Sequence, residues 1–354
     1  MKISFLGDIC FNDKYNELYL DGSKPFDNIS KITKKSSLVI GNLECVSKGK
    51  DSKKNFLKRP HLSTNVETLN YLSDINVNMV CLANNHIYDY LYDGYDETIN
   101  FLNSNNIIHI GATPLKENRI NPIIKEIDDI KFCFLNYVTI DTNPNLPEDS
   151  KITVNIFDKN QVIKYIKEYK QKVDQVIVLL HWGGNTENGY YPDLNQAEIA
   201  RDLIDSGADL IVGHHSHTFQ AYECYKGKYI FYSLGNFCFS DIYNDNQLYS
   251  RLSNRQRKSI ILEIDFIKDD NYLVNIVPIR NINGYIKKSN KKLRLLQSYT
   301  RNYIFKFLKR SKILWNTYYI KLKKIDPIIN YIFVQRGSIR KALTYDKMSK
   351  YFYH

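Results

Sequence analysis

The chain has 354 residues, of which 43% are hydrophobic and 25% charged, a composition typical of a globular protein with a sizeable core. No run approaches the roughly 18 consecutive apolar residues of a membrane-spanning helix, so none is expected. The net charge of +11 is uneven, because residues 281–354 hold 18 Lys and Arg against two acidic residues and leave about −5 on the rest. We therefore expect a main domain over residues 1–280 and a basic, helical C-terminal extension over residues 281–354.

The six cysteines are dispersed, form no Cys-x-x-Cys pair, and stand mostly in apolar runs. This pattern predicts free thiols in a reducing compartment and not a disulfide framework. The start of the chain, from Met1 to Asp8, leaves no room for a signal peptide before the first chemically informative residue. We therefore expect a cytoplasmic protein, or one that is peripheral at the inner face of the membrane.

Up to about Asp209, strand-like apolar runs alternate with helix-like segments. Thr64 to Glu67 matches a capping box, which predicts a helix with apolar residues at helical spacing after it. Asp193 followed by Gln196 predicts the start of another helix, and Gly207 is placed to end it.

Beyond residue 210 the pattern changes to β-hairpins. Phe219 to Glu223 and Lys228 to Ser233 are strand-like and flank a turn at Lys226-Gly227. Ser259 to Phe266 and Tyr272 to Pro278 suggest a second antiparallel pair. An alternating first part followed by hairpins predicts an α/β protein with two packed mixed sheets flanked by helices.

Five strand-like runs are each followed directly by polar residues of the kinds that bind metals. Singly, these clusters have ordinary explanations: a turn, a helix cap, or a buried histidine in the core. Their recurrence at five strand ends is better explained by one shared metal site, because sheet proteins gather scattered residues at strand ends. The clusters are Gly7-Asp8, Gly41-Asn42-Leu43-Glu44, Asn84-Asn85-His86, His181-Trp182-Gly183 and Gly213-His214-His215-Ser216-His217.

The residue types in these clusters indicate which ions they would bind. Asp8 and Glu44 offer carboxylates, and Asn85 offers an amide oxygen. Histidines suit Mn, Fe or Zn better than Mg or Ca, so we expect a divalent transition metal. The set is large enough for two ions, an arrangement used to activate water for attack on phosphorus. The imidazoles come from His181, His215 and His217, and His86 could donate a proton to a leaving oxygen.

In this order, and together with Ser233-Leu234-Gly235-Asn236-Phe237, the clusters resemble the CapA family of poly-γ-glutamate capsule proteins, a branch of the calcineurin-like metallophosphoesterases. The likeness runs from about Lys2 to Phe239. It implies a four-layer α/β/β/α sandwich with Arg59 as a candidate anion-binding residue and His86 as the acid. It also implies that Asn236 lines the site and that the metal ligands are Asp8, Glu44, Asn85, His181, His215 and His217.

The chain departs from the wider superfamily at several positions. Cys10 stands where an Asp-x-His motif would have its histidine, and Glu44 ends a segment in which the superfamily has Gly-Asp-x-x-Asp. Asn185 follows His181-Trp182-Gly183 where a Glu often occurs, and Ser216 replaces a Pro.

We interpret the chain as a metal-dependent hydrolase of the phosphoesterase type, linked to capsule or cell-surface polymer metabolism. Poly-γ-glutamate is joined by amide bonds, so hydrolysis or transfer at a γ-glutamyl amide is an open alternative. A noncatalytic component of a polymer synthesis or export complex is another.

The basic extension has several candidate partners. It could pack on the acidic main domain, contact an anionic membrane surface, or bind an anionic polymer. Nucleic acid is less favoured, since no recognised nucleic-acid module accompanies the charge.

Overall fold

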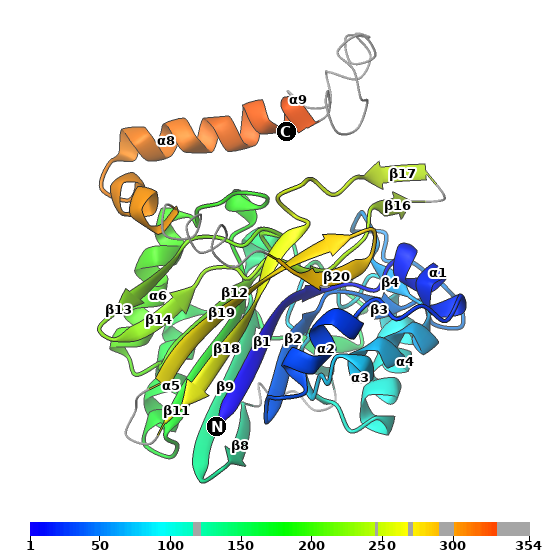
Figure 1. The fold of residues 1–354 in the computed structure, drawn as a ribbon, viewed down its shortest axis with the longest axis horizontal. Helices are drawn as coiled ribbons and strands as arrows, with labels where there is room; N and C mark the ends of the chain where they lie inside the picture. The colour runs from blue at the N-terminus through cyan, green and yellow to red at the C-terminus, as the bar shows by residue number, and fades with distance from the viewer. Residues whose placement is uncertain (116–121, 245–246, 268–271, 290–300, 331–354) are drawn as a thin grey trace.

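We describe a computed structural model of the chain, which covers residues 1–115, 122–244, 247–267, 272–289 and 301–330. Two mixed β-sheets lie face to face, and helices cover the outer face of each sheet (Figure 1). This is the four-layer α/β/β/α arrangement that the family resemblance implies.

The first sheet combines strands from both ends of the described chain. Its order is β20-β19-β18-β1-β2-β5-β6, and β15 pairs with the far end of β1. The parallel strands are β1 (Lys2–Ile9), β2 (Leu38–Leu43), β5 (Met79–Cys81), β6 (Ile108–Ile110) and β15 (Asn236–Cys238). The antiparallel strands are β18 (Lys258–Phe266), β19 (Tyr272–Ile282) and β20 (Tyr285–Lys288).

The second sheet has the order β13-β14-β12-β11-β9-β8. Its four central strands are parallel, namely β9 (Ile130–Val138), β11 (Gln175–His181), β12 (Leu210–His214) and β14 (Lys228–Phe231). The edge strands β8 (Ile123–Ile127) and β13 (Tyr222–Tyr225) are antiparallel to their neighbours. Both hairpins predicted from the sequence, β13–β14 and β18–β19, are confirmed.

Within the described residues, three two-stranded sheets lie outside the main pair. They are β3 (Val46–Ser47) with β4 (Ser63–Thr64), β7 (Ala112–Pro114) with β10 (Ile152–Val154), and β16 (Ile242–Asn244) with β17 (Gln247–Ser250).

The helices form two outer layers and a C-terminal segment (Figure 1). Those beside the first sheet are α1 (Lys14–Leu20), α2 (Asp27–Thr33), the 3₁₀ helix η1 (Val66–Asn70), α3 (Tyr71–Asp74) and α4 (Leu91–Ser104). Those beside the second are α5 (Lys159–Lys170) and α6 (Leu194–Asp205), with short 3₁₀ turns η3 (Ile140–Thr142) and η4 (Gly184–Thr186) in the connections. The C-terminal segment contains a helical stretch over residues 301–308, then α8 (Lys312–Ile320), the π-helix η5 (Lys321–Ile325) and α9 (Asp326–Asn330).

Three apolar clusters hold the layers together. The central cluster lies between the sheets and includes Phe5 and Leu262 from the first sheet and Phe134 and Leu179 from the second. The other two lie between each sheet and its helices. Fully burying a Leu, Ile or Phe side chain contributes about 1.5–3 kcal/mol, so these contacts account for most of the attraction between layers.

The predicted helix start at Asp193 is confirmed, whereas the predicted capping box at Thr64 to Glu67 is wrong. Asp193 and Gln196 form the reciprocal hydrogen bonds of a capping box at the start of α6, which ends just before Gly207 with its φ of +113°. At Thr64 to Glu67 there is no side-chain cap. The reason is that the Thr64 hydroxyl instead donates to Asn16 Oδ1 at 3.0 Å.

Close approach of two backbones explains the glycine of the Gly7-Asp8 motif. Asp8 N donates to Gly235 O at 3.0 Å, where β15 joins β1. A Cβ atom on Gly7 would lie 1.8 Å from that same oxygen. Any larger residue at position 7 would therefore push β1 and β15 apart.

The C-terminal segment packs against the helical layer of the second sheet. Phe305, Leu308 and Trp315 are buried in the apolar cluster there. The first sheet itself continues to Lys288 through β20. The division of the chain near residue 280 stays a prediction. Among the described residues, no helix combines the length and apolar character needed to cross a bilayer.

Candidate metal centre

The six predicted metal ligands lie together where strands of both sheets end. Asp8 is in β1, Glu44 directly follows β2, and Asn85 follows β5. His181 is the last residue of β11, and the loop after β12 supplies the other two histidines, His215 and His217. Because the carboxyl ends of parallel strands meet at one edge of each sheet, residues far apart in the sequence converge there.

The candidate ligand atoms form two overlapping groups. Glu44, His181 and His215 make one group, and Asp8, Glu44 and His217 make the other; within each, the atoms all lie within 4.8 Å of one another. Asn85 joins the first group through its Oδ1, which is 2.8 Å from His181 Nε2. Glu44 is common to both groups, so its carboxylate would help to hold an ion in either of them.

Several buried polar atoms in the cluster have no hydrogen-bond partner among the described residues. They are both carboxylate oxygens of Glu44, Oδ2 of Asp8 and Nε2 of His215. Burying such atoms unpaired is costly, and burying a carboxylate is more so. The donor set, two carboxylates with amide oxygen and imidazole nitrogens, therefore fits divalent transition metals.

Burial of the candidate ligands also shifts their pKa values. Burial, followed by the nearby charge of Asp8, raises the pKa of Glu44 well above its ordinary value. Burial, followed by His215, lowers the pKa of His181 well below its ordinary value. Bound cations would reverse the first shift and favour the neutral imidazole as a ligand.

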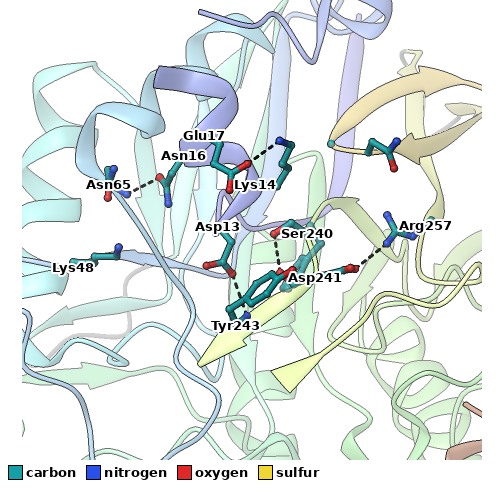
Figure 2. Close-up of a pocket in the computed structure, with 13 residues that line it drawn as sticks. Asp13, Lys14, Asn16, Glu17, Lys48, Asn65, Ser240, Asp241, Tyr243 and Arg257 are labelled. Atoms are coloured by element: carbon teal, nitrogen blue, oxygen red, sulfur yellow. Dashed lines mark hydrogen bonds and ion pairs between the residues drawn. The ribbon is translucent and has the colours of Figure 1, made fainter. Parts of the chain in front are cut away.

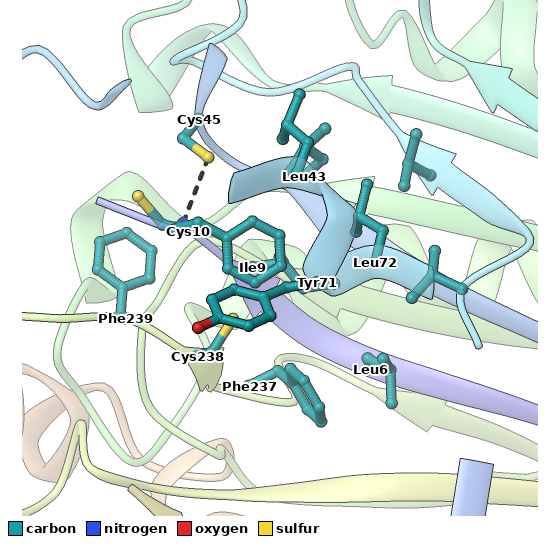
Figure 3. Packing of buried hydrophobic residues seen from close by; sticks show 14 of the residues in the cluster. Leu6, Ile9, Cys10, Leu43, Cys45, Tyr71, Leu72, Phe237, Cys238 and Phe239 are labelled. Carbon is teal, nitrogen blue, oxygen red and sulfur yellow. Dashed lines mark hydrogen bonds between the residues drawn. The ribbon is translucent and has the colours of Figure 1, made fainter. Parts of the chain in front are cut away.

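Cys10, in the position where the superfamily has a histidine, does not join the cluster. It is fully buried in the apolar cluster beside α1 to α4, among Cys45, Tyr71 and Phe239 (Figure 3). Phe11 N donates to Cys45 Sγ at 3.4 Å within the same packing. All six cysteines are free thiols.

His86 is held by a carboxylate that the sequence did not single out. Its Nδ1 lies 2.6 Å from Asp89 Oδ2, and this oxygen also accepts from Leu62 N at 2.7 Å. The His86 backbone N–H donates to Asn84 Oδ1 at 2.9 Å. Burial lowers the pKa of His86 to about 4, although Asp89 opposes this shift. The i, i+3 spacing of His86 and Asp89 was the feature of the sequence that could have indicated this contact.

Two asparagines and a further histidine connect the ligand residues. Asn42 Nδ2 donates to Asp8 Oδ1 at 2.9 Å and lies 3.2 Å from His181 Nδ1. Asn236, which the resemblance put at the site, has its Oδ1 2.8 Å from His217 Nδ1. His214 Nδ1 lies 3.4 Å from Asp8 Oδ1 and was not among the predicted ligands.

A cavity of about 420 Å³ opens over the cluster. His86, His215, His217 and Asn236 are in its lining, and so are two neighbouring cations. Arg59, the predicted anion-binding residue, has an exposed side chain there. Lys58, which sequence reasoning missed, is the more enclosed of the two, and its ammonium donates to the Asn85 carbonyl oxygen. Burial lowers the pKa of Lys58 to about 8.

Comparison with known proteins identifies relatives. The PGA biosynthesis protein CapA of Bacillus subtilis is 31% identical over 243 residues, which is 68% of this chain and 63% of the relative. The capsule biosynthesis protein CapA of Bacillus anthracis is 32% identical over 223 residues, or 60% of this chain and 53% of the relative. The matches thus span between half and two thirds of these relatives.

Among solved structures, a protein described as a novel phosphatase from Mycoplasma pneumoniae aligns with 83% of this chain and 96% of its own, at 14% identity and a TM-score of 0.48. A family model described as "Bacterial capsule synthesis protein PGA_cap" matches residues 2–241, a stretch that contains every predicted site residue. The chain therefore belongs to the bacterial capsule synthesis protein PGA_cap family.

Proposed function

We propose that this protein is a metal-dependent hydrolase of the phosphoesterase type that acts in capsule or cell-surface polymer metabolism. The observation that carries the proposal is the pair of overlapping ligand groups that share Glu44, whose two buried oxygens have no hydrogen-bond partner among the described residues, beneath an open cavity. Membership of the capsule family supports the biological setting.

The residues that would hold the ions are Asp8, Glu44, Asn85, His181, His215 and His217. When bound, divalent transition metals would act as Lewis acids. They would also lower the pKa of water, so that a nucleophile becomes available at neutral pH.

The remaining residues have roles of their own in this proposal. Asp89 orients His86, and its charge favours the protonated imidazole that could pass a proton to the leaving group. Lys58 and Arg59 carry positive charge on the cavity wall, where they would bind anionic oxygens of a substrate. Asn236 fixes the ring of His217 through its amide oxygen.

The proposal has two versions, which differ in the bond that is cleaved: a phosphoester or a γ-glutamyl amide. A phosphoester is the reaction class suggested by the resemblance to metallophosphoesterases. The relatives named for PGA biosynthesis suggest instead hydrolysis or transfer at a γ-glutamyl amide. The same residues could serve either reaction, because both need a polarised acceptor and a protonated leaving group.

The test is metal analysis of the purified chain together with two activity assays. Hydrolysis of an aryl phosphodiester and monoester with Mn²⁺ would be measured beside hydrolysis of a γ-glutamyl anilide. We expect near-stoichiometric transition metal in the wild type and loss of both metal and activity in Asp8→Ala and His215→Ala. His109→Ala, a histidine of β6 outside the cluster, is the matched control.

The results of these assays distinguish a phosphoesterase, an enzyme acting on γ-glutamyl amides and a noncatalytic protein. Metal with phosphoesterase activity supports the first version, and metal with activity only on the anilide supports the second. A folded protein with neither metal nor activity would contradict the enzyme proposal and favour a noncatalytic component of a synthesis or export complex.

We further propose that the C-terminal segment contacts an anionic membrane surface. Ile313 is 78% exposed and Ile320 55% exposed, and both stand among basic residues such as Lys312 and Lys321. Apolar side chains interleaved with lysines suit the headgroup region of anionic bilayers. A peripheral location at the inner face of the membrane is the corresponding prediction.

Sedimentation with anionic liposomes tests this second proposal. We expect salt-sensitive pelleting of the wild type that is weakened in Ile313→Glu. Leu20→Glu, at an equally exposed apolar position in the main domain, is the control. Wild-type protein that never pellets would end the membrane proposal.

A further inference from the structure

A loop on the wall of the metal cavity connects the candidate ligands to the C-terminal segment. Residues 184–191, here called the cavity loop, lie between β11 and α6. Three residues of this loop line the metal cavity, namely Gly184, Glu187 and Asn188. The backbone N–H of Asn188 donates to the Ser216 carbonyl oxygen at 2.8 Å. Because Ser216 stands between His215 and His217, this hydrogen bond joins the cavity loop to the segment that supplies two of the six candidate ligands.

Both of these histidines hold an unusual backbone conformation. The backbone angle φ is +86° at His215 and +54° at His217. Residues other than glycine seldom adopt a positive φ, and such strain persists only where the surrounding contacts impose it. One such contact is local, since Ser216 Oγ donates to the Thr218 carbonyl oxygen at 2.9 Å. Another is the hydrogen bond from Asn188, so the backbone of the two ligands depends in part on the cavity loop.

The C-terminal segment packs directly on the cavity loop. Tyr318 Oη accepts a hydrogen bond from Tyr191 N at 3.2 Å, and the centres of the two rings lie 4.9 Å apart. A Cβ atom on Gly189 would lie 2.5 Å from the same Tyr318 oxygen, so the helix approaches the loop backbone closely. Lys323 Nζ donates to the Gly184 carbonyl oxygen at 3.1 Å. Residues of α8 and η5 therefore contact the cavity loop at both of its ends.

Arg255 joins the cavity loop to the C-terminal segment at a further point. Its Nη1 donates to the Asn188 carbonyl oxygen at 3.0 Å, and both Nη1 and Nη2 lie 3.3 Å from Asp326 Oδ2. The guanidinium carbon also lies 5.0 Å from the centre of the Tyr190 ring. Asn188 thus accepts a hydrogen bond from an ion pair with the C-terminal segment, and its N–H donates to Ser216 between the two ligands.

The turn that carries Arg255 is itself anchored. Arg257 Nη2 donates to Asp241 Oδ1 at 2.8 Å (Figure 2), and Leu252 N donates to the same oxygen at 2.9 Å. Leu252 also lines the metal cavity. Because the turn is fixed in this way, Arg255 transmits the position of the C-terminal segment to the cavity loop.

We propose that the C-terminal segment positions two ligands of the metal centre, with Arg255 and Lys323 holding the cavity loop and Asn188 passing this constraint to His215 and His217. Loss of the contacts would free the cavity loop, and the strained backbone of the two histidines would then relax away from its ligand geometry. Metal would bind more weakly as a result. The inference rests on the proposed function in one respect, which is that the six candidate ligands bind metal.

The test measures the Kd for Mn²⁺ by calorimetry on the full chain after its metal has been removed. We expect Arg255→Met to raise this Kd roughly tenfold, the lower end of the range for residues that orient metal ligands. Arg255→Lys keeps a cation that can reach the Asn188 oxygen or Asp326, so its Kd should lie between those of the wild type and Arg255→Met. Lys323→Met should also raise the Kd. Lys324→Met makes the same charge change at the exposed next residue and should stay within about twofold of the wild type.

Co²⁺ in place of Mn²⁺ adds a spectroscopic readout. The visible absorption of bound Co²⁺ depends on the geometry of its ligands. We expect its bands to shift in Arg255→Met and Lys323→Met and to stay unchanged in Lys324→Met. Unfolding of the chain as a whole would instead abolish the bands, and circular dichroism checks that each variant is folded.

Failure of this inference is distinguishable from failure of the proposed function. Folded Arg255→Met and Lys323→Met proteins with the wild-type Kd and spectrum would overturn the inference and leave metal-dependent hydrolysis untouched. Equal losses of affinity in Lys323→Met and Lys324→Met would overturn it too, because they would show an effect of net charge alone. A wild-type chain that binds neither Mn²⁺ nor Co²⁺ would contradict both proposals.

Discussion

His86 Nδ1 and Asp89 Oδ2 lie 2.6 Å apart, and both side chains are buried. Because the same Asp89 oxygen accepts from Leu62 N, the carboxylate is fixed from two directions. It therefore holds the His86 ring with Nδ1 toward Asp89, and Nε2 is left for the acid role proposed above. This relationship makes Asp89 a positioning residue for His86.

Replacing Asp89 with Asn should lower kcat roughly 10- to 100-fold with a smaller change in KM, because the ring would lose its orientation and the charge that favours its protonated form. The measurement is steady-state kinetics on whichever substrate the assays above identify. Asp96→Asn, which makes the same charge change on α4, should leave kcat within about twofold. A folded Asp89→Asn protein with wild-type kcat would contradict the positioning role.

Gly7→Ala should destabilise the protein far more than Gly41→Ala. At Gly7 the new Cβ would lie 1.8 Å from the Gly235 carbonyl oxygen, which belongs to backbone. At Gly41 the nearest atom, at 2.4 Å, is the flexible end of the Ile9 side chain. Overpacking typically costs about 1–3 kcal/mol, and we expect Gly7→Ala at or above the upper end. Urea denaturation of the two variants checks the order, and equal costs would be inconsistent with a tight β1–β15 contact.

The metal-free protein should lose stability as the pH falls below about 6.5. Burial lowers the pKa of His86 to about 4 and those of His181 and His215 well below the ordinary value, so the unfolded chain binds these protons first. For each of these groups, the free energy of unfolding falls by about 1.4 kcal/mol per pH unit, until the pH reaches the pKa that the group has in the folded protein. Glu44, whose pKa is raised, acts in the opposite direction, but it is one group against three.

Thermal unfolding of chelator-treated protein at pH 7.5 and 5.5 checks this prediction. Tm should be lower at pH 5.5, and the difference should shrink in His86→Asn, which removes one of the three groups. A Tm that rises on acidification would show that Glu44 dominates.

Phe305→Ala should loosen the C-terminal segment, whereas Phe307→Ala should not. Phe305 is 1% exposed and packs on Tyr232, while Phe307 is 47% exposed. Removing a buried Phe costs about 3–5 kcal/mol, so we expect faster proteolytic removal of this segment in the first variant only. Equal cleavage of both variants would show that other contacts, such as that of Lys309 with Glu223, hold the segment.

The sequence indicated which polar residues lie together better than it predicted the local structure around them. Apolar runs followed by polar clusters located Asp8, Glu44 and His181 at strand ends, because strand burial and metal chemistry both depend on residue type. Thr64 to Glu67 has the residue types of a capping box, but the Thr64 hydroxyl donates instead to Asn16, which is distant in sequence. Such competition between local and tertiary hydrogen bonds cannot be read from one segment.

The positioning residues were missed for a related reason. Asn42 and Asp89 were within or near the recognised motifs, but their roles depend on where the rings of His181 and His86 lie. Lys58 stands beside Arg59 in the sequence, and only the three-dimensional arrangement distinguishes the enclosed cation from the exposed one.

The pairing of β1 has a consequence for how the chain folds during synthesis. Residues 2–5 of β1 are hydrogen-bonded to β18, which begins only at Lys258, beyond the segment that matches the family model. A nascent chain that has emerged only to residue 241 therefore has an open edge on its first strand, and open edges favour intermolecular pairing. The family segment by itself is an incomplete folding unit, and it should aggregate until the β18–β19 hairpin closes that edge.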